Sequence, residues 1–272
     1  MVAPVRIDDP EDPRIAPFRD VRERDLVGRE GRFVAEGAVV LAVLAASPQH
    51  RVEAVLIDER RAEGLAATLA RLPETTPIHL AARNVLDAIA GFPLHRGILA
   101  VGRRAAPIAP EALVAGLGER AVVVVACGIA NHDNIGGIFR NAAAFGADAV
   151  LLDAECCDPF YRKAIRVSVG HVLTVPQARF ASAADPIGLL SRHGFEVLSL
   201  SPSAPQRLID VVPPPRAAIV LGTEGAGLPT SILARSRAVS IPMAPGVDSL
   251  NVAVTAGIVL HHLTARRRPA AT

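Results

Sequence analysis

The stretch that decides the fold is Val239–Leu263, which reads V-S-I-P-M-A-P-G-V-D-S-L-N-V-A-V-T-A-G-I-V-L-H-H-L. It predicts a short strand over 238–243, a loop rich in Pro and Gly, and a helix whose N-cap is Asp248 or Ser249. The helix is apolar on nearly every side, which is typical of burial in a core or against a second subunit. Ser249 and Asn251 lie in its first turn, and buried polar groups need hydrogen-bond partners. We therefore expect the chemistry of the protein to collect at this strand, loop and helix.

The composition excludes several classes of protein. The chain has 272 residues, which is enough for two modest domains, and half of the residues are apolar. The net charge is only +2, so the chain is not a strongly basic protein that wraps nucleic acid. With no Trp, one Tyr and eight Phe, a platform that stacks many bases is not expected. The N-terminus mixes Asp, Glu and Arg, so we expect no signal peptide. Polar residues interrupt the apolar C-terminal helix, so we expect no membrane crossing.

The cysteines indicate a reducing environment. Cys127, Cys156 and Cys157 lack Cys-x-x-Cys spacing, and an adjacent pair is not a disulfide framework. A cytoplasmic location fits this pattern. No group of His, Cys and Asp residues has the spacing of metal ligands, so we expect no metal.

Alternating strand and helix patterns divide the chain into two α/β domains. A charged, Pro-rich arm over 1–20 precedes a small α/β domain over 21–104. A Pro-rich linker and domain entry over 105–120 leads to a second α/β series over 121–272. That series begins with the apolar strand Val122–Ala126, which is typical of a parallel sheet buried on both faces.

Three polar stretches of the second domain are candidates for a functional site. The first, N-H-D-N-I-G-G-I-F-R over 131–140, combines helix caps, glycines and an arginine and suits an anion, although an ordinary capped helix explains it too. The second, V-L-G-T-E-G-A-G-L-P over 220–229, runs from a buried strand into glycines at the sheet edge where ligands bind, or is a tight turn. The third is the opening stretch. The alternative to a functional role is that its polar residues only cap the helix, with Asn251 hydrogen-bonded in the core.

Taken together and in this order, the three stretches resemble the signature motifs of the SpoU (TrmH-type) branch of the SPOUT RNA methyltransferases. The matches are N-x-G-x-x-x-R at Asn134, Gly136 and Arg140, G-x-E-G at Gly222, Glu224 and Gly225, and I-P-M with S-L-N-V at 241–243 and 249–252. The resemblance covers the chain from Ala121 onward. Residues 21–104 resemble the small ribosomal-protein-like domain that often precedes it and binds the substrate. One departure is Asn141, which stands where the family often has Thr.

The resemblance implies a parallel-sheet domain with a deep trefoil knot and a homodimer formed through that domain. It also implies methyl transfer from S-adenosyl-L-methionine to a ribose 2′-hydroxyl in RNA, with ribosomal RNA favoured over tRNA. A non-catalytic RNA-binding or ribosome-assembly factor on the same scaffold is the alternative, which the retained motif residues argue against.

The resemblance also assigns roles to residues of this chain. Arg140 would stabilise the charge that develops on the attacking oxygen, and Arg is a poor base. The other catalytic residues implied are Asn134, Glu224, Ser249 and Asn251. The cofactor would be bound by Leu221, Gly222, Thr223, Gly225, Ile241, Met243, Ser249 and Leu250. Outside the motifs, Arg162 and Arg166 share one helix face, which is either an RNA-backbone patch or a solvated surface.

Overall fold

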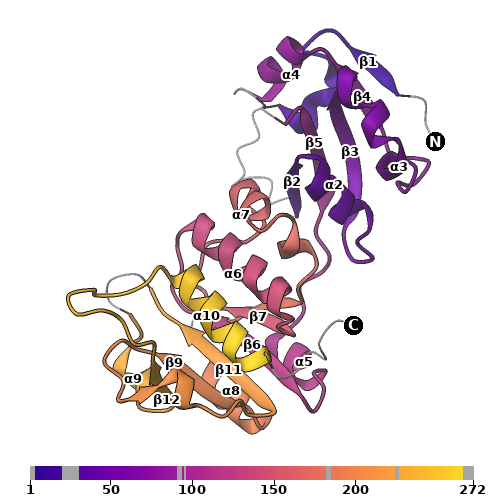
Figure 1. Cartoon of the computed structure of the whole chain (residues 1–272). Coiled ribbons are helices and arrows are strands. Elements are labelled where there is room, and N and C mark those ends of the chain that lie inside the picture. The colour runs from indigo at the N-terminus through magenta and orange to yellow at the C-terminus, as the bar shows by residue number, and fades with distance from the viewer. Residues whose placement is uncertain are drawn as a thin grey trace, which may run out of the picture. The chain divides into compact units, whose positions relative to one another are not determined.

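The chain folds into two α/β units, each built around its own sheet (Figure 1). The computed structural model describes residues 4–19, 31–90, 94, 96–181, 185–223 and 227–265. The first unit comprises Met1–Ala106 and Asp158–Thr174, and the second comprises Pro107–Cys157 and Val175–Thr272. The segment Asp158–Thr174 therefore packs with the first unit, although it follows strands of the second along the chain.

A mixed five-stranded sheet forms the first unit. In spatial order its strands are β1 (Val5–Ile7), β4 (Ile78–Ala81), β3 (Arg51–Asp58), β5 (Ile98–Arg103) and β2 (Arg32–Glu36). Strands β1, β4 and β3 are parallel, whereas β5 runs antiparallel to both of its neighbours. The helices are α2 (Ala38–Ala45), α3 (Ala66–Leu69), α4 (Arg83–Ala90) and α7 (Arg162–Val167), with 3-10 turns at Pro13–Phe18, Glu59–Arg61, Glu63–Leu65 and His171–Leu173.

Residues 4–19 are part of this core, where the sequence predicted a charged arm. Strand β1 pairs with β4 at the edge of the sheet, and the side chains of Ile7, Ile15 and Phe18 are at most 1% exposed. The strand is three residues long and the 3-10 turn contains Pro17, so neither element shows a hydrophobic period that a sequence pattern could reveal.

An all-parallel seven-stranded sheet forms the second unit, which confirms the parallel-sheet prediction. In spatial order its strands are β10 (Gln206–Arg207), β12 (Arg237–Ser240), β9 (Glu196–Leu200), β11 (Arg216–Leu221), β6 (Ala121–Ala126), β7 (Ala149–Leu152) and β8 (Gln177–Arg179). The helices are α5 (Pro110–Ala115), α6 (His132–Phe145), α8 (Pro186–Arg192), α9 (Thr230–Leu233) and α10 (Val252–Thr264), with a 3-10 turn at Leu208–Asp210. None of the helices within the described ranges is long and apolar enough to cross a membrane.

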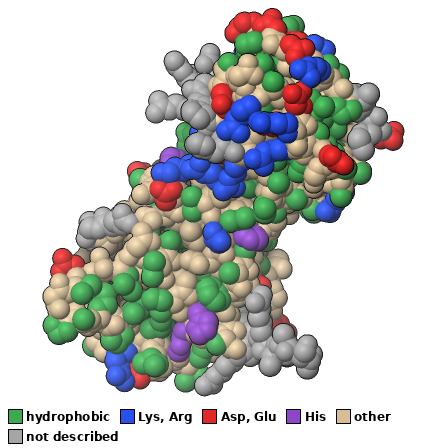
Figure 2. Space-filling model, turned by 45° about the horizontal axis from the view of Figure 1, so that its top comes forward, with side chains coloured by type: hydrophobic (Ala, Val, Ile, Leu, Met, Phe, Trp, Pro, Cys, Tyr) green, Lys and Arg blue, Asp and Glu red, His purple; other side chains and the backbone are tan. Residues whose placement is uncertain are grey.

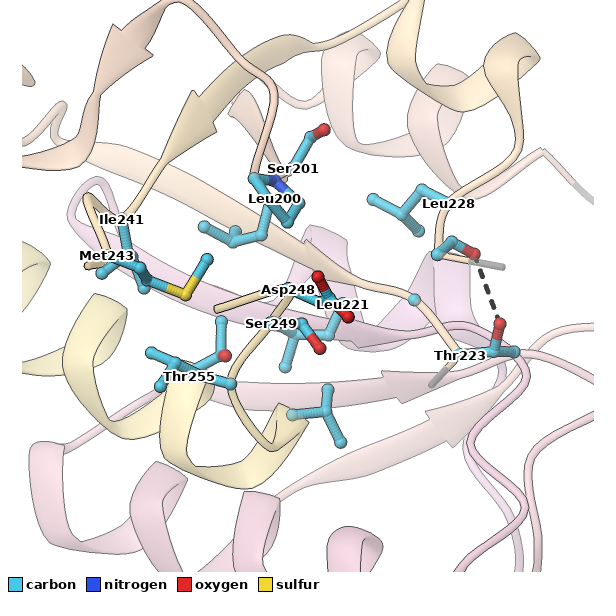
Figure 3. Close-up of a pocket in the computed structure, with 15 residues that line it drawn as sticks. Leu200, Ser201, Leu221, Thr223, Leu228, Ile241, Met243, Asp248, Ser249 and Thr255 are labelled. Atoms are coloured by element: carbon cyan, nitrogen blue, oxygen red, sulfur yellow. Dashed lines mark hydrogen bonds between the residues drawn. The ribbon is translucent and has the colours of Figure 1, made fainter. Parts of the chain in front are cut away.

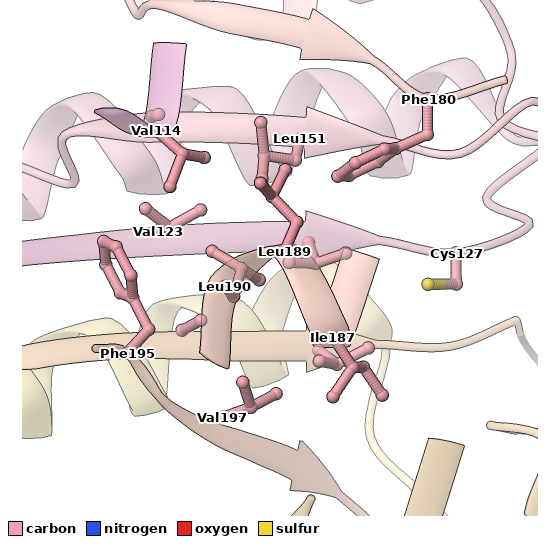
Figure 4. Packing of buried hydrophobic residues seen from close by; sticks show 14 of the residues in the cluster. Val114, Val123, Cys127, Leu151, Phe180, Ile187, Leu189, Leu190, Phe195 and Val197 are labelled. Atoms are coloured by element: carbon pink, nitrogen blue, oxygen red, sulfur yellow. The ribbon is translucent and has the colours of Figure 1, made fainter. Parts of the chain in front are cut away.

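The core of the second unit lies on both faces of this sheet. Every residue of the interior strand β6 is buried, as its unbroken apolar run predicted. On one face, Val114 of α5 and Leu190 of α8 pack with Val123 and Leu151 of the sheet (Figure 4). Each buried Val or Leu contributes roughly 1.5–3 kcal/mol, so this face holds the strands in the arrangement that shapes the site.

Candidate functional site

A pocket of about 420 Å³ lies at the carboxyl edge of the parallel sheet (Figure 3). Its walls are the loops that follow β9, β11 and β12, together with the first turns of α10. These loops meet because the carboxyl ends of neighbouring parallel strands lie at the same edge of a sheet, where α/β proteins bind ligands. Of the residues predicted to bind a cofactor, the structure places these on the pocket wall: Leu221, Gly222, Thr223, Ile241, Met243, Ser249 and Leu250.

Two predicted residues of the loop after β11 cannot be placed. Glu224 and Gly225 lie outside the described residues. On either side of them, the Gly227 N–H donates to the Thr223 carbonyl at 3.2 Å, and Thr223 Oγ1 donates to the Gly227 carbonyl at 3.4 Å (Figure 3). The loop therefore closes on itself at the point where it borders the pocket.

Gly222 is required at its position because the backbone of Gly227 packs directly against it. A Cβ added there would lie 2.7 Å from the Gly227 backbone carbon and 2.9 Å from Leu228 Cγ. No side chain fits at such a distance from backbone, so the sequence uses glycine where strand β11 runs into the pocket.

The sequence did not point to part of the pocket wall. Leu200, Ser201 and Pro202 line it from the loop after β9 and lie in none of the three candidate stretches, whereas Leu228 and Thr255, which also line it, lie in the second and third. The only signal for the first three is that they follow a buried strand. That signal could locate them only with the knowledge that β9 lies beside β11.

The cap of helix α10 differs from the prediction. The helix begins at Val252, and Asn251 caps it by accepting hydrogen bonds from the N–H groups of Ala253 at 2.9 Å and Val254 at 3.3 Å. Asp248 and Ser249, the predicted caps, belong to the preceding loop. Asp, Ser and Asn cap helices about equally well, so three of them within four residues leave the helix start undetermined by sequence.

The first and third motifs meet through their asparagines. Asn251 Nδ2 donates to Asn134 Oδ1 at 2.8 Å, and Asn134 is only 5% exposed in the first turn of α6. A buried amide left without a partner would cost about 1–3 kcal/mol. The pair therefore ties the start of α6 to the start of α10, directly beside the pocket.

Small and amide side chains continue this contact along the two helices. Asn141 Nδ2 donates to the Ala253 carbonyl at 2.6 Å, and a Cβ on Gly137 would lie only 2.6 Å from Ala253 Cβ. A Cβ on Gly257 would lie 3.3 Å from Asn141 Nδ2. Asn141, which departs from the family pattern, thus has a structural role in joining α6 to α10.

Arg140 does not take part in this contact. It is exposed and makes no hydrogen bond or ion pair with any described residue, and Asn251 bonds to Asn134 rather than to its guanidinium. The reason is helical geometry: six residues after Asn134, the helix has turned by about 240°, and the side chain leaves from another face.

The site shows no arrangement for a metal. Among the residues that the structure describes, no three His, Cys, Asp or Glu side chains gather closely enough to hold an ion.

Comparison with known proteins identifies the family to which these motifs belong. Residues 121–261 match the model of the SpoU rRNA methylase family. A protein of Mycobacterium bovis described as an uncharacterized tRNA/rRNA methyltransferase is 39% identical over 267 residues, covering 94% of this chain and 90% of its own. The 23S rRNA (guanosine-2′-O-)-methyltransferase RlmB of Salmonella typhi is 29% identical, covering 84% of this chain and 96% of its own.

A solved structure shares the fold. The AdoMet-bound rRNA methyltransferase from Sinorhizobium meliloti superposes with a TM-score of 0.76, is 22% identical, and covers 97% of this chain and 98% of its own. The family match covers more than half of the chain and spans all three motifs. As those motifs predicted, the chain belongs to the SpoU rRNA methylase family of RNA methyltransferases.

Proposed function

We propose that this protein transfers a methyl group from S-adenosyl-L-methionine to a ribose 2′-hydroxyl of ribosomal RNA. The observation that carries the proposal is the convergence of three separate motifs. Two of them form walls of one pocket, and the third is held against them by the hydrogen bond between Asn134 and Asn251. The names of the relatives, which include a ribosomal RNA 2′-O-methyltransferase, support the substrate class.

The pocket suits S-adenosyl-L-methionine in size and chemistry. Its volume of about 420 Å³ is in the range of small-molecule sites, and Leu221, Ile241 and Met243 give it an apolar lining. Among the lining residues that the structure describes, Asp248 alone has a charged side chain. When bound, the cofactor supplies an activated methyl group on a positively charged sulfur, and a carboxylate in the wall complements that charge.

The motif residues would divide the work around the attacking hydroxyl. The hydroxyl oxygen would form a bond to the methyl carbon as the carbon–sulfur bond breaks, and the hydroxyl proton would pass to solvent or to a phosphate oxygen of the RNA. Negative charge that develops on the oxygen is stabilised by a positioned cation. A guanidinium presents N–H donors and no acceptor, so Arg140 would act electrostatically rather than as a base. Its exposed guanidinium has no partner among the described residues and is available to RNA. Ser249, Asn134 and Asn251 would orient the hydroxyl group and the arginine. Glu224 stays a predicted catalytic residue.

Replacing Asp248 by asparagine should weaken binding of S-adenosyl-L-methionine relative to the demethylated product. The cofactor carries one more positive charge than the product, so only the cofactor loses an attraction. Because Asp248 is exposed, we expect a loss of roughly two- to fivefold. Calorimetric titration of both ligands measures the ratio, and an equal change for both would contradict the charge argument.

The target RNA is decided by comparing ribose methylation in a strain that lacks this gene with its parent. Loss of one 2′-O-methyl group from ribosomal RNA is the expected result, whereas loss from tRNA would move the substrate to that class. If no methylation is lost and the purified protein does not bind S-adenosyl-L-methionine, the non-catalytic alternative replaces the enzyme.

The proposal includes the finer features of the family fold. A trefoil knot in the second unit is supported by the way the C-terminal segment 241–252 shares one pocket with the loops after β9 and β11. An RNA-binding role for the first unit is supported by its small mixed sheet and its F-V-A-E-G stretch over 33–37.

We also propose that the second unit forms a homodimer through an apolar groove of about 470 Å³. The groove lies between the 208–213 segment and helix α10. Its residues Ile209, Val212 and Ile258 are 72%, 75% and 38% exposed, and hydrophobic side chains gather beside His side chains in the lower part of Figure 2. Apolar side chains gathered at a surface in this way mark an interface.

The double variant Ile209→Asp/Val212→Asp should convert the dimer to a monomer, because it buries two carboxylates in the interface. Light scattering after gel filtration measures the mass. The matched control is Ile108→Asp, at a 45% exposed position outside the groove, which should leave the mass unchanged. A wild-type protein that is already monomeric would contradict the dimer.

A cytoplasmic location is part of the same proposal. Cys127 and Cys156 are free, buried thiols, and burial raises the pKa of each to about 12. Thiols in this state do not form disulfides readily, which suits a reducing compartment.

A further inference from the structure

We propose that one end of the sheet of the first unit, formed by Arg61, Arg96 and Arg162, binds the phosphate backbone of the substrate RNA. This surface, called the arginine edge below, rests on the proposed function and assigns its RNA contact to specific residues. It lies where β2 and β3 end and β5 begins, at Glu36, Asp58 and Gly97.

Arg96 lies flat across the end of β2. A Cβ added to Gly37 would meet Arg96 Cδ at 2.8 Å and Nη1 at 3.2 Å. Gly37 has a φ of 96°, a conformation that favours glycine, and follows the buried Glu36 directly. The absence of a side chain at Gly37 thus leaves the space that the guanidinium of Arg96 occupies, and Arg96 itself is exposed.

Arg61 takes the equivalent place at the start of β5. A Cβ on Gly97, whose φ is 60°, would meet Arg61 Nε at 3.1 Å. Because Gly97 follows Arg96 in the chain, the two arginines flank the same strand start. Neither Arg61 nor Arg96 forms a salt bridge with a carboxylate of the described residues, and both are exposed. The charge of Arg61 is nevertheless close enough to Asp58 to help lower the pKa of that carboxyl.

The carboxylates at this edge are already neutralised by other arginines. Asp58, whose side chain is 2% exposed, accepts from Arg60 Nη2 at 2.7 Å, and this bonding lowers the pKa of Asp58. Glu36, whose side chain is 5% exposed, accepts from Arg162 Nη1 at 3.1 Å. Arg60 and Arg61 share the single charge of Asp58, and Arg96 has no salt bridge among the described residues, so this edge keeps an excess of positive charge. Figure 2 shows Lys and Arg side chains crowded together on the face in view.

The chemistry of the arginine edge fits phosphate rather than bases. A guanidinium presents a planar fork of donors that matches two phosphate oxygens, and such contacts position a nucleic acid without reading its sequence. Arg162 is paired with Glu36 and 28% of its side chain is exposed, so it would add positive charge at this edge. Arg61 and Arg96 would contact the phosphates directly.

The test is RNA binding by the double variant Arg61→Ala/Arg96→Ala as a function of salt. Losing two phosphate contacts should reduce the slope of log affinity against log salt by about 1.4, since each contact to single-stranded RNA contributes roughly 0.7. At low salt the affinity should fall by about tenfold or more for every RNA sequence tested. The KM for RNA should rise while kcat and the affinity for S-adenosyl-L-methionine stay unchanged.

The matched control is Arg51→Ala/Arg71→Ala, which removes two exposed arginines from the same unit. Arg51 begins β3 at the opposite end of the sheet, and Arg71 lies in the connection that returns to that end before β4. An unchanged salt slope in the test variant, or an equal loss in the control, would overturn the arginine edge. If the wild-type protein binds RNA through this edge but methylates none, the proposed function fails and the surface stands.

Discussion

Replacing Arg140 by alanine should abolish methyl transfer, with a loss of at least about a hundredfold in kcat, while the affinity for S-adenosyl-L-methionine changes by less than about twofold. The expected separation of the two effects follows from the structure. Arg140 is absent from the pocket wall and makes no contact with the asparagine pair that borders it. Its removal therefore takes away charge stabilisation at the attacking oxygen without disturbing the pocket. Calorimetry and single-turnover methyl transfer measure the two quantities.

Two further variants make this result specific. Arg140→Lys keeps the charge but loses the planar fork, so it should recover part of the activity if the role is electrostatic. Arg120→Ala removes another exposed arginine of the same unit and should change neither quantity. A parallel loss of cofactor affinity in Arg140→Ala would show that the residue belongs to the cofactor pocket instead.

The sequence predicted the elements whose pattern is long and regular. The valine run of β6 is typical of an interior strand of a parallel sheet that is buried on both faces, and β6 lies inside the sheet between β11 and β7. Residues 4–19 gave no such pattern, because a three-residue strand and a Pro-containing turn are too short to show a period. Their burial depends on a neighbour, β4, that lies far away in the chain.

The site was predictable to the extent that its residues lie in motifs. Ser249 and Leu250, which the resemblance assigned to a cofactor site, line the pocket, whereas Leu200 and Ser201 reach it only because β9 lies beside β11. Arg140 shows a different limit. A motif gives the spacing of residues along the chain but not the direction of their side chains. Arg140 follows Asn134 by six residues, and helix geometry turns its side chain away from the asparagine pair.

Replacing Gly222 by alanine should lower the affinity for S-adenosyl-L-methionine by about tenfold or more, which corresponds to about 1.4 kcal/mol. The added Cβ would lie 2.7 Å from the Gly227 backbone carbon and 2.9 Å from the Gly227 carbonyl oxygen, which accepts the hydrogen bond from Thr223 Oγ1. Backbone cannot yield as a flexible side chain does, so the turn between Thr223 and Gly227 must open. Leu228, which is 8% exposed, would move with it, and the pocket loses one wall.

The control separates this local effect from a general loss of stability. Gly118→Ala adds the same methyl group to the same unit at a position with nothing within 4 Å, so it should leave cofactor affinity unchanged. Overpacking at Gly222 costs about 1–3 kcal/mol of folding free energy, which thermal unfolding will show as a modest fall in Tm. Affinity is therefore compared at a temperature where both variants are folded. If Gly222→Ala binds the cofactor as tightly as Gly118→Ala does, the turn after β11 does not shape the pocket, and the cofactor must be held by the other two loops alone.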